Sequence, residues 1–319
     1  MQEPSWRRTP VIWSAFRQAA PKRKGWKQMR LVSFERDGAC RYGAVIGNKV
    51  IDLSAKLGAM YPTIIDFIAK NAVAEAAAII AGAQGDYSYD ELKLLPVVPN
   101  PRHIICVGLN YHDHITEANK QLSRNDKGFE RPMIFARWPE SLTAHNQPIF
   151  RPKVSTELDY EAELLVVIGK DTDRYVKSDK ALDYVFGYSC LNEACLRDYQ
   201  RHSRQINPGK NFEKTGATGP WLVTADDIKD PENLIIEMRL NGQIMQKANT
   251  GDMIHSVAQV IEYVTEWMPL QAGDLIASGT MGGVGFARDP QVFMKPGDVA
   301  EVTIQGIGTL RNEIADERL

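Results

Sequence analysis

Two glutamates separated by one residue stand at the start of an apolar segment. Glu161 and Glu163 lead into residues 164–169, LLVVIG, a run rich in β-branched side chains that ends at a glycine and is typical of a buried strand. Because side chains alternate along a strand, Glu161 and Glu163 project from the same face. Two half-buried carboxylates repel each other unless a divalent cation neutralises them. The pattern favours a metal site, and the alternative is a charged pair on a solvated strand edge.

A third carboxylate follows further along the chain. Glu193 lies where strand-like residues give way to a helix-forming run, and Arg197, four residues on, is available to balance its charge. Three carboxylates without His or Cys select a hard cation, so Mg²⁺ is expected, with Mn²⁺ or Ca²⁺ as substitutes. A 2-oxo acid can chelate such an ion, which would stabilise the enolate left when a bond at C3 breaks.

The candidate base is a histidine close to a glutamate. His114 and Glu117 are three residues apart in a predicted helical turn, so Glu117 can orient and charge the imidazole. From the residues alone, a surface His beside a surface Glu is the more common interpretation. Lys210 could hold a developing oxyanion, or it could be a solvated loop lysine.

Several short motifs in this part of the chain resemble the fumarylacetoacetate hydrolase family. In order along the chain they are ICVGLNYHDH at 105–114, EAE at 161–163, NEACLRDYQ at 192–200, GKNF at 209–212, GPWLVT at 219–224, NG at 241–242 and SGT at 278–280. The order of the motifs matches the family, and the resemblance covers roughly residues 100 to 313. The chain differs at Glu193, where family members usually carry Asp, and at Cys195, where they carry Ser or Thr. It also differs at Arg137, where a Lys is common, and at Met281, where the family often has Pro. We expect these two positions to influence substrate choice more than chemistry.

The resemblance implies an α+β protein with a mixed β-roll catalytic domain and a small N-terminal α+β domain, usually a homodimer. It implies metal ligands Glu161, Glu163 and Glu193, the catalytic pair His114 and Glu117, and Lys210 as a third catalytic residue. Arg197, Gln200 and Thr280 are expected to bind substrate. The extra methylene of Glu193 adds about 1.5 Å of reach and could shift the cation.

The activity that follows is hydrolysis of a C–C bond in a 2,4-dioxo acid of the acylpyruvate type, by a Mg²⁺-dependent enzyme and through a metal-stabilised enolate, as in the catabolism of aromatic compounds. Three alternatives stay open on the same site. They are decarboxylation of an oxaloacetate-type acid, isomerisation of an unsaturated oxo diacid, and a catalytically silent metal-binding homologue.

Composition limits the other classes of function. With 44% hydrophobic residues, a net charge of −2 and a pI near 6.3, the chain has no global feature of a nucleic-acid or membrane partner. No apolar run approaches the length of a transmembrane helix. The cysteines, which are Cys40, Cys106, Cys190 and Cys195, lack zinc-type or disulfide spacing, so they are expected to be reduced thiols in a cytoplasmic protein.

Three segments divide the chain. Residues 1–28 carry seven Lys or Arg against one acid and three Trp, which suits a targeting peptide, an arm on a partner subunit, or a dispensable extension. Organellar targeting is therefore open. Residues 29–95 alternate short strands and helices, and the proline-rich joint at 95–101 leads into a catalytic domain over residues 96–319. Predicted strands there include 104–107, 133–135, 164–168, 235–240, 275–278 and 299–304.

Overall fold

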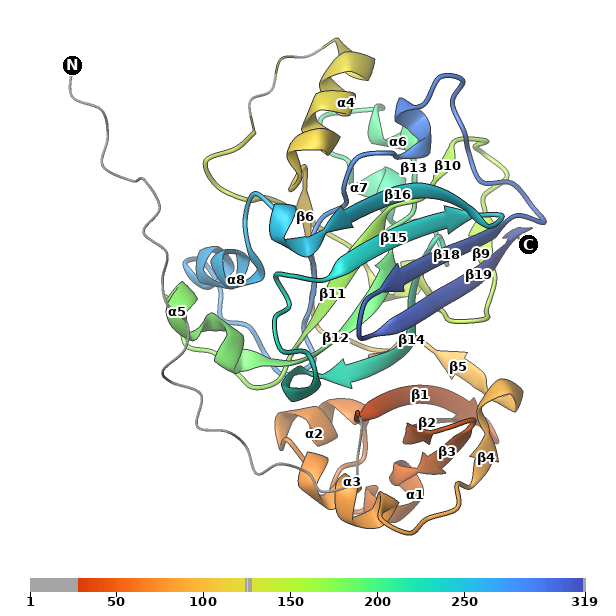
Figure 1. Cartoon of the computed structure of the whole chain (residues 1–319), viewed down its shortest axis with the longest axis vertical. Helices are drawn as coiled ribbons and strands as arrows, with labels where there is room; N and C mark the ends of the chain where they lie inside the picture. The colour runs from red at the N-terminus through yellow and green to blue at the C-terminus, as the bar shows by residue number, and fades with distance from the viewer. Residues whose placement is uncertain (1–27, 124, 126–127, 318–319) are drawn as a thin grey trace.

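The computed structural model describes residues 28–123, 125 and 128–317 (Figure 1). Of the basic extension predicted at residues 1–28, all but the last residue lies outside this range. Within the described residues, no helix is long and apolar enough to cross a membrane. The longest, α4, covers His112–Leu122.

The N-terminal part of the chain, at the bottom of Figure 1, combines a sheet with three helices. The short strands expected within residues 29–95 include those at 30–36, 39–46 and 49–52, which pair in antiparallel order. Thr63 caps the second helix, with its hydroxyl and the Asp66 carboxylate bonding each other's backbone N–H. The elements are β1 Arg30–Arg36, β2 Ala39–Ile46, β3 Lys49–Asp52, α1 Leu53–Leu57, α2 Ile64–Ala69, α3 Val73–Ile80, β4 Tyr87–Ser88 and β5 Lys93–Leu95.

A single large sheet continues from this part into the rest of the molecule. Its strand order is β4-β3-β2-β1-β14-β12-β11-β17-β6-β7, with β5 beside β1 and β8 beside β14. Every residue of β11 is buried, as expected for its apolar run. The added strands are β6 Ile104–Gly108, β7 Met133–Ala136, β8 Leu142–Ala144, β11 Ala162–Ile168, β12 Val185–Asn192, β14 Gly216–Thr224 and β17 Leu275–Ala277.

A five-stranded sheet of order β16-β15-β18-β19-β9 packs beside the large one, and a short pair joins β10 to β13. In β15 and β18, inward and outward residues alternate, as expected for one covered face. These strands are β9 Ile149–Arg151, β10 Leu158–Asp159, β13 Cys195–Leu196, β15 Ile235–Leu240, β16 Gln243–Asn249, β18 Val299–Ile304 and β19 Gly308–Asp316. The remaining helices are α5 Ser178–Ala181, α6 Arg197–Gln200, α7 Asn207–Lys210 and α8 Val257–Thr265.

The central strand β14 was not expected from the sequence, because it contains Pro220, which cannot donate to a sheet ladder. The structure accommodates it with a register shift opposite, between Tyr188 and Cys190 of β12. The hydroxyl of Ser189, at this shift, donates to the carbonyls of Gly219 and Trp221. A strand whose ladder is broken at a bulge does not show a continuous strand pattern.

The N-terminal part and the catalytic part share a core. Strand β1 pairs directly with β14, with Leu31 opposite Leu222. Phe67 of α2 belongs to the same buried cluster as Leu165 of β11. The large sheet therefore contains strands from both sides of the domain boundary predicted near residue 95. The division into two domains stays a prediction. The α+β class with mixed strand directions is confirmed.

Candidate active site

The three glutamates predicted as metal ligands meet at one end of the central strands. Glu163 lies on β11, Glu161 directly precedes it, and Glu193 directly follows β12. These two strands are antiparallel neighbours, with Ala162 opposite Asn192. One carboxylate oxygen from each glutamate lies within 4.8 Å of those of the other two. All three side chains are buried.

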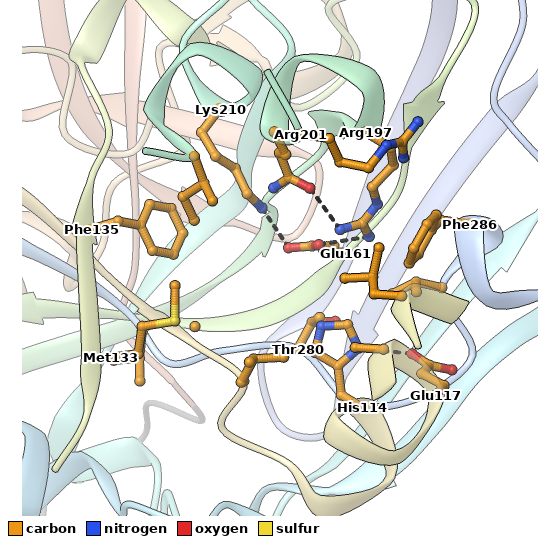
Figure 2. A pocket seen from close by; sticks show the side chains of 18 of the residues that line it. His114, Glu117, Met133, Phe135, Glu161, Arg197, Arg201, Lys210, Thr280 and Phe286 are labelled. Carbon is orange, nitrogen blue, oxygen red and sulfur yellow. Dashed lines mark hydrogen bonds and ion pairs between the residues drawn. The ribbon is translucent and has the colours of Figure 1, made fainter. Parts of the chain in front are cut away.

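Three cations hold two of these carboxylates. Lys210 Nζ donates to Glu161 Oε2 at 2.6 Å, to the Glu193 carbonyl oxygen at 3.1 Å and to the Glu193 carboxylate. Arg197 Nη2 forms an ion pair with Glu161 Oε1 at 2.7 Å, so Lys210 and Arg197 both reach toward Glu161 (Figure 2). Arg137 Nη1 donates to Glu193 Oε1.

Burial and the neighbouring charges shift the pKa values of Glu161 and Glu163 in opposite directions. Burial alone would raise the pKa of Glu161, but the charges of Lys210 and Arg197 outweigh it and hold that pKa well below its usual range. Burial likewise opposes the charge of Lys210, yet the neighbouring carboxylates raise its pKa above the ordinary value. Burial raises the pKa of Glu163 well above its usual range, and the charges of Glu193 and Glu161 raise it further.

Of the three carboxylates, Glu163 is the one that lacks a countercharge within the described residues. Its Oε2 accepts a hydrogen bond from the backbone N–H of Gly279 at 2.8 Å, and among the described residues it has no ion-pair partner. A buried carboxylate without a cation is costly, and a divalent ion would supply the missing charge. The donor set of three carboxylates suits a hard cation. The site therefore fits a divalent metal ion held by Glu161, Glu163 and Glu193.

The predicted dyad lies on α4, across the pocket from Lys210 (Figure 2). His114 Nδ1 lies 2.8 Å from Glu117 Oε1, as expected for residues one helical turn apart. The other oxygen, Glu117 Oε2, accepts from the backbone N–H of Gly283 at 2.7 Å. Because the Glu117 carboxylate can only accept, its contact with His114 assigns the proton of a neutral imidazole to Nδ1 and leaves Nε2 with a lone pair. His112, by contrast, is exposed.

A pocket of about 600 Å³ joins the dyad to the carboxylates. It is lined by His114, Glu117, Glu161, Glu163, Lys210, Arg197, Gln200 and Thr280, among other residues. All the residues predicted to be catalytic, substrate-binding or metal-binding therefore line one cavity except Glu193, which is fully buried behind its ion pairs with Arg137 and Lys210.

The contacts of Thr280 and Lys210 narrow the roles expected for them. Thr280 Oγ1 donates to the Ala162 carbonyl at 3.0 Å and accepts from Gln246 at 2.9 Å, so its hydroxyl hydrogen is already used. The three hydrogen bonds of Lys210 engage all three donors of its ammonium group, so only its charge remains to act on a ligand in the pocket. Gln200 accepts from Arg197 through Oε1, and its amide NH₂ remains for the pocket.

Arg197 does not balance Glu193, which corrects the expectation drawn from their spacing. The short strand β13 lies between them, and α6 begins only at Arg197, so helical spacing does not apply. Arg197 instead donates through Nε to Asp159 at 2.8 Å and pairs with Glu161. The countercharges of Glu193 are Arg137 and Lys210.

Arg137 and Asp159 are the residues whose roles were missed from the sequence. Arg137 is buried and also donates to Ser141, Ala194 and Thr215, so it holds Glu193 rather than lining the pocket as a selector of substrate. Met281, assigned to the same role, is buried as well. Asp159 ends β10, two residues before Glu161, and its side chain is buried like those of Glu161 and Glu163. The available signal was a third acidic residue at the same spacing, just before the Glu161–Glu163 pair.

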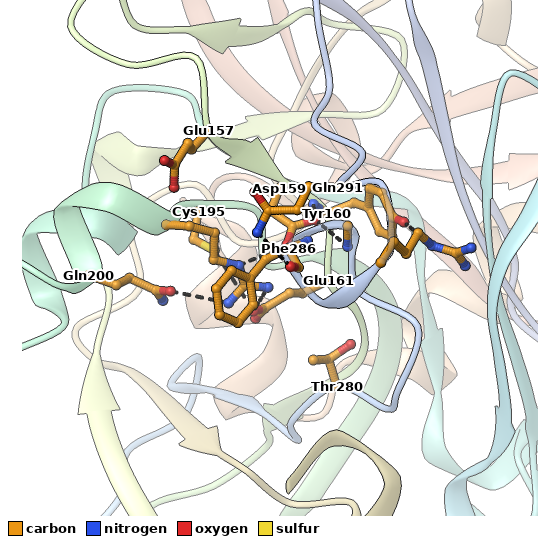
Figure 3. Close-up of polar contacts among 12 residues, drawn as sticks. Glu157, Asp159, Tyr160, Glu161, Cys195, Gln200, Thr280, Phe286 and Gln291 are labelled. Atoms are coloured by element: carbon orange, nitrogen blue, oxygen red, sulfur yellow. Dashed lines mark hydrogen bonds and ion pairs between the residues drawn. The ribbon is translucent and has the colours of Figure 1, made fainter. Parts of the chain in front are cut away.

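One backbone segment connects these groups. Residues 279–286 donate N–H groups to three different carboxylates: Gly279 to Glu163, Gly283 to Glu117, and both Gly285 and Phe286 to Asp159. Phe286 lies beside Asp159 and Glu161 in Figure 3, with its ring 5.5 Å from the Arg197 guanidinium. The segment therefore positions the metal-site carboxylate, the dyad and the partner of Arg197 together.

Cys195 is not an activated nucleophile. Its Sγ lies 3.8 Å from Glu161 Oε1 in a fully buried position. Burial raises the pKa of this thiol to about 12, so it is neutral near pH 7. The four cysteines are free, and Cys40 is the exposed one.

Comparison with known proteins identifies the family. Residues 103–315 match the model of the family described as fumarylacetoacetate (FAA) hydrolase, C-terminal. The chain is 41% identical over 230 residues to oxaloacetate tautomerase YisK of Bacillus subtilis (strain 168), which covers 72% of this chain and 75% of the relative. The chain belongs to the fumarylacetoacetate hydrolase family, as the motifs indicated.

Other relatives match more of the chain. The mitochondrial oxaloacetate tautomerase Fahd2a of Rattus norvegicus is 34% identical over 295 residues, covering 90% of this chain and 92% of the relative. The structure of fumarylacetoacetate hydrolase from Exiguobacterium antarcticum has a TM-score of 0.71 at 33% identity, covering 91% of this chain and all of that chain. Maleylpyruvate hydrolase from Sphingobium sp. SYK-6, in complex with manganese(II) and pyruvate, has a TM-score of 0.74 at 28% identity, with 91% and 100% covered. Hydrolases and tautomerases thus share this fold.

Proposed function

We propose that this protein is a divalent-cation-dependent enzyme that interconverts the enol and keto forms of oxaloacetate. The observation that carries the proposal is the His114–Glu117 dyad lining the same pocket as Glu161 and Glu163. The names of the relatives from Bacillus subtilis and Rattus norvegicus support the choice of reaction. Mg²⁺ is the proposed ion, because the donor set consists only of carboxylate oxygens.

The reaction moves one proton between oxygen and carbon. In the enol, the proton is on the C2 hydroxyl, and in the keto form it is on C3. His114 Nε2 can accept the hydroxyl proton and return it to C3, while Glu117 stabilises the imidazolium that exists between the two transfers. A bound divalent ion would supply positive charge for the carboxylate and C2 oxygens of the substrate.

The remaining residues orient the substrate and stabilise its charge. Lys210 and Arg197 place two positive charges at the buried end of the pocket, where negative charge develops on the C2 oxygen. Phe135 and Phe286, which also line the pocket, restrict the access of water to that end. These side chains need not form or break a bond to carbon.

Hydrolysis of a 2,4-dioxo acid is a second candidate, favoured by the same dyad. A base with a free Nε2 can deprotonate a water as well as an enol, and attack of that water on the distal carbonyl would cleave the C–C bond. The likeness to maleylpyruvate hydrolase supports this alternative. The two reactions differ in whether water is consumed, so their products distinguish them.

The test compares three substrates under the same conditions. Purified protein with Mg²⁺ should accelerate the loss of enol absorbance of oxaloacetate, and EDTA should abolish the effect. Acetylpyruvate and fumarylpyruvate should release pyruvate more slowly than oxaloacetate ketonises. If acetylpyruvate or fumarylpyruvate released pyruvate faster than oxaloacetate ketonises, the protein would be a hydrolase and the tautomerase proposal would be rejected. No turnover of any substrate, by protein that binds Mg²⁺, would leave a catalytically silent homologue.

A further inference from the structure

One arginine of the pocket has no hydrogen-bond or ion-pair partner among the residues that the structure describes. Four cationic residues line the cavity: Arg197, Arg201, Arg204 and Lys210. Arg197 and Lys210 pair with buried carboxylates, and Arg201 Nη2 lies 2.7 Å from Glu157 Oε2. Arg204 is exposed and makes no hydrogen bond or ion pair within the described part of the chain. Its guanidinium is therefore available to an anion that enters the pocket.

Arg204 lies in the chain between the two cations that contact Glu161 at the buried end of the pocket. Arg204 belongs to the connection between α6, which begins at Arg197, and α7, which ends at Lys210. The two helices that flank this connection thus each carry a cation that contacts Glu161, and the connection itself carries Arg204, which is exposed. Ser203 fixes the turn, because its hydroxyl donates to the Gln205 carbonyl at 3.2 Å and accepts the Gln205 N–H at 3.0 Å.

The size of the pocket leaves room beyond the reacting carbons. A volume of about 600 Å³ lies in the range of pockets that hold drug-sized ligands and exceeds what a three- or four-carbon acid fills. A substrate whose first carboxylate and oxo group occupy the buried end, as proposed for oxaloacetate, therefore directs its other end toward the open part of the pocket that Arg204 lines. Arginine binds a carboxylate through two parallel N–H donors, which fixes the position of that end.

We propose that Arg204 binds the second carboxylate of a 2-oxo diacid and makes the site select diacids over monoacids of the same length. The inference rests on the proposed function, which assigns the oxo end of the substrate to the buried carboxylates. Because Arg204 is exposed, solvent screening limits its contribution, and we expect a preference of about tenfold at low salt. The preference should shrink as ionic strength rises.

The test uses matched pairs of unreactive ligands. Dissociation constants are measured by calorimetry, at saturating Mg²⁺, for 2-oxoadipate against 2-oxohexanoate and for 2-oxoglutarate against 2-oxopentanoate. Arg204→Gln should remove most of the tenfold diacid preference in at least one pair, and Arg204→Lys should keep part of it. The pair that responds reports how far Arg204 lies from the oxo end. Arg102→Gln removes an exposed arginine outside the pocket and should change neither pair.

Two results would overturn the proposal. One is a diacid preference that survives Arg204→Gln unchanged in both pairs, or that is absent from the wild-type protein. The other is a preference lost in Arg201→Gln and kept in Arg204→Gln, which would assign the anion to Arg201. These outcomes are independent of turnover. Absence of tautomerase activity alongside Arg204-dependent binding would reject the proposed reaction and leave the diacid site in place.

Discussion

The carboxylates at the buried end of the pocket and the dyad on α4 are held in different ways. Glu161 and Glu193 are bound by cations, Lys210 among them, inside the protein. His114 and Glu117 are held by one another, by a single helix and by one backbone N–H. The first group is tied into the stability of the fold, whereas the second can be altered at little structural cost. Changes in the two groups should therefore have separable effects.

The largest effect is expected from Glu161→Gln. This change leaves the buried charges of Lys210 and Arg197 without a partner they share, so it should lower the free energy of unfolding by about 3 kcal/mol as well as abolish Mg²⁺ binding. Thermal or denaturant unfolding and calorimetry measure the two losses. Glu35→Gln removes an exposed ion pair with Lys93 and should cost less than about 1 kcal/mol. Equal free energies of unfolding for the two variants would contradict the claim that the buried ion pairs of Glu161 contribute more to stability than the exposed pair of Glu35.

His114→Ala should reduce activity without reducing stability by a comparable amount. Loss of a positioned base is expected to lower kcat by roughly a hundredfold to ten-thousandfold, with a smaller change in KM. Mg²⁺ affinity should be retained, because His114 is not among the three carboxylate ligands. His112→Ala, on the exposed side of the same helix, is the matched control and should leave kcat near the wild-type value. Similar losses in both variants would point to α4 as a whole rather than to the dyad.

Glu193→Asp tests whether the longer side chain is matched to Arg137. The shorter carboxylate loses about 1.5 Å of reach and cannot keep its contacts with both Arg137 and Lys210, so Mg²⁺ affinity should fall about tenfold. The double variant Arg137→Lys with Glu193→Asp brings in the residues common in the family and should recover part of the loss. A double-mutant cycle without coupling between the two positions would show that they act independently.

The smallest effect is the proton released when Mg²⁺ binds. Because burial and the neighbouring carboxylates raise the pKa of Glu163, it must lose its proton before it contacts the ion. Mg²⁺ affinity should then rise with pH, by up to about tenfold per unit, until Glu163 is deprotonated. Calorimetry in buffers of different ionisation enthalpy counts the proton, and Glu163→Gln, in which no proton is lost, provides the comparison. The same proton count in the variant would assign it to another group.

The local patterns of the sequence were sufficient where a residue acts through its own strand or helix. The alternation at Glu161 and Glu163 and the helical spacing of His114 and Glu117 place each pair on one face, as the structure shows. Contacts between distant segments were not accessible in this way. The ion pair between Arg137 and Glu193 joins residues 56 positions apart and depends on how the sheet closes. The bulge opposite Pro220 likewise exists only through pairing with β12.

The backbone hydrogen bonds of residues 279–286 align the acidic side chains of the site independently of the side chains that the segment itself carries. Glu163, Glu117 and Asp159 are aligned by main-chain N–H groups, which every residue other than proline provides. Val284 and Phe286 of the same segment direct side chains into the pocket. Their replacement can reshape the cavity while the frame that aligns the acids persists. Substitutions in this one segment can therefore change the substrate range while the geometry of the acidic groups is preserved.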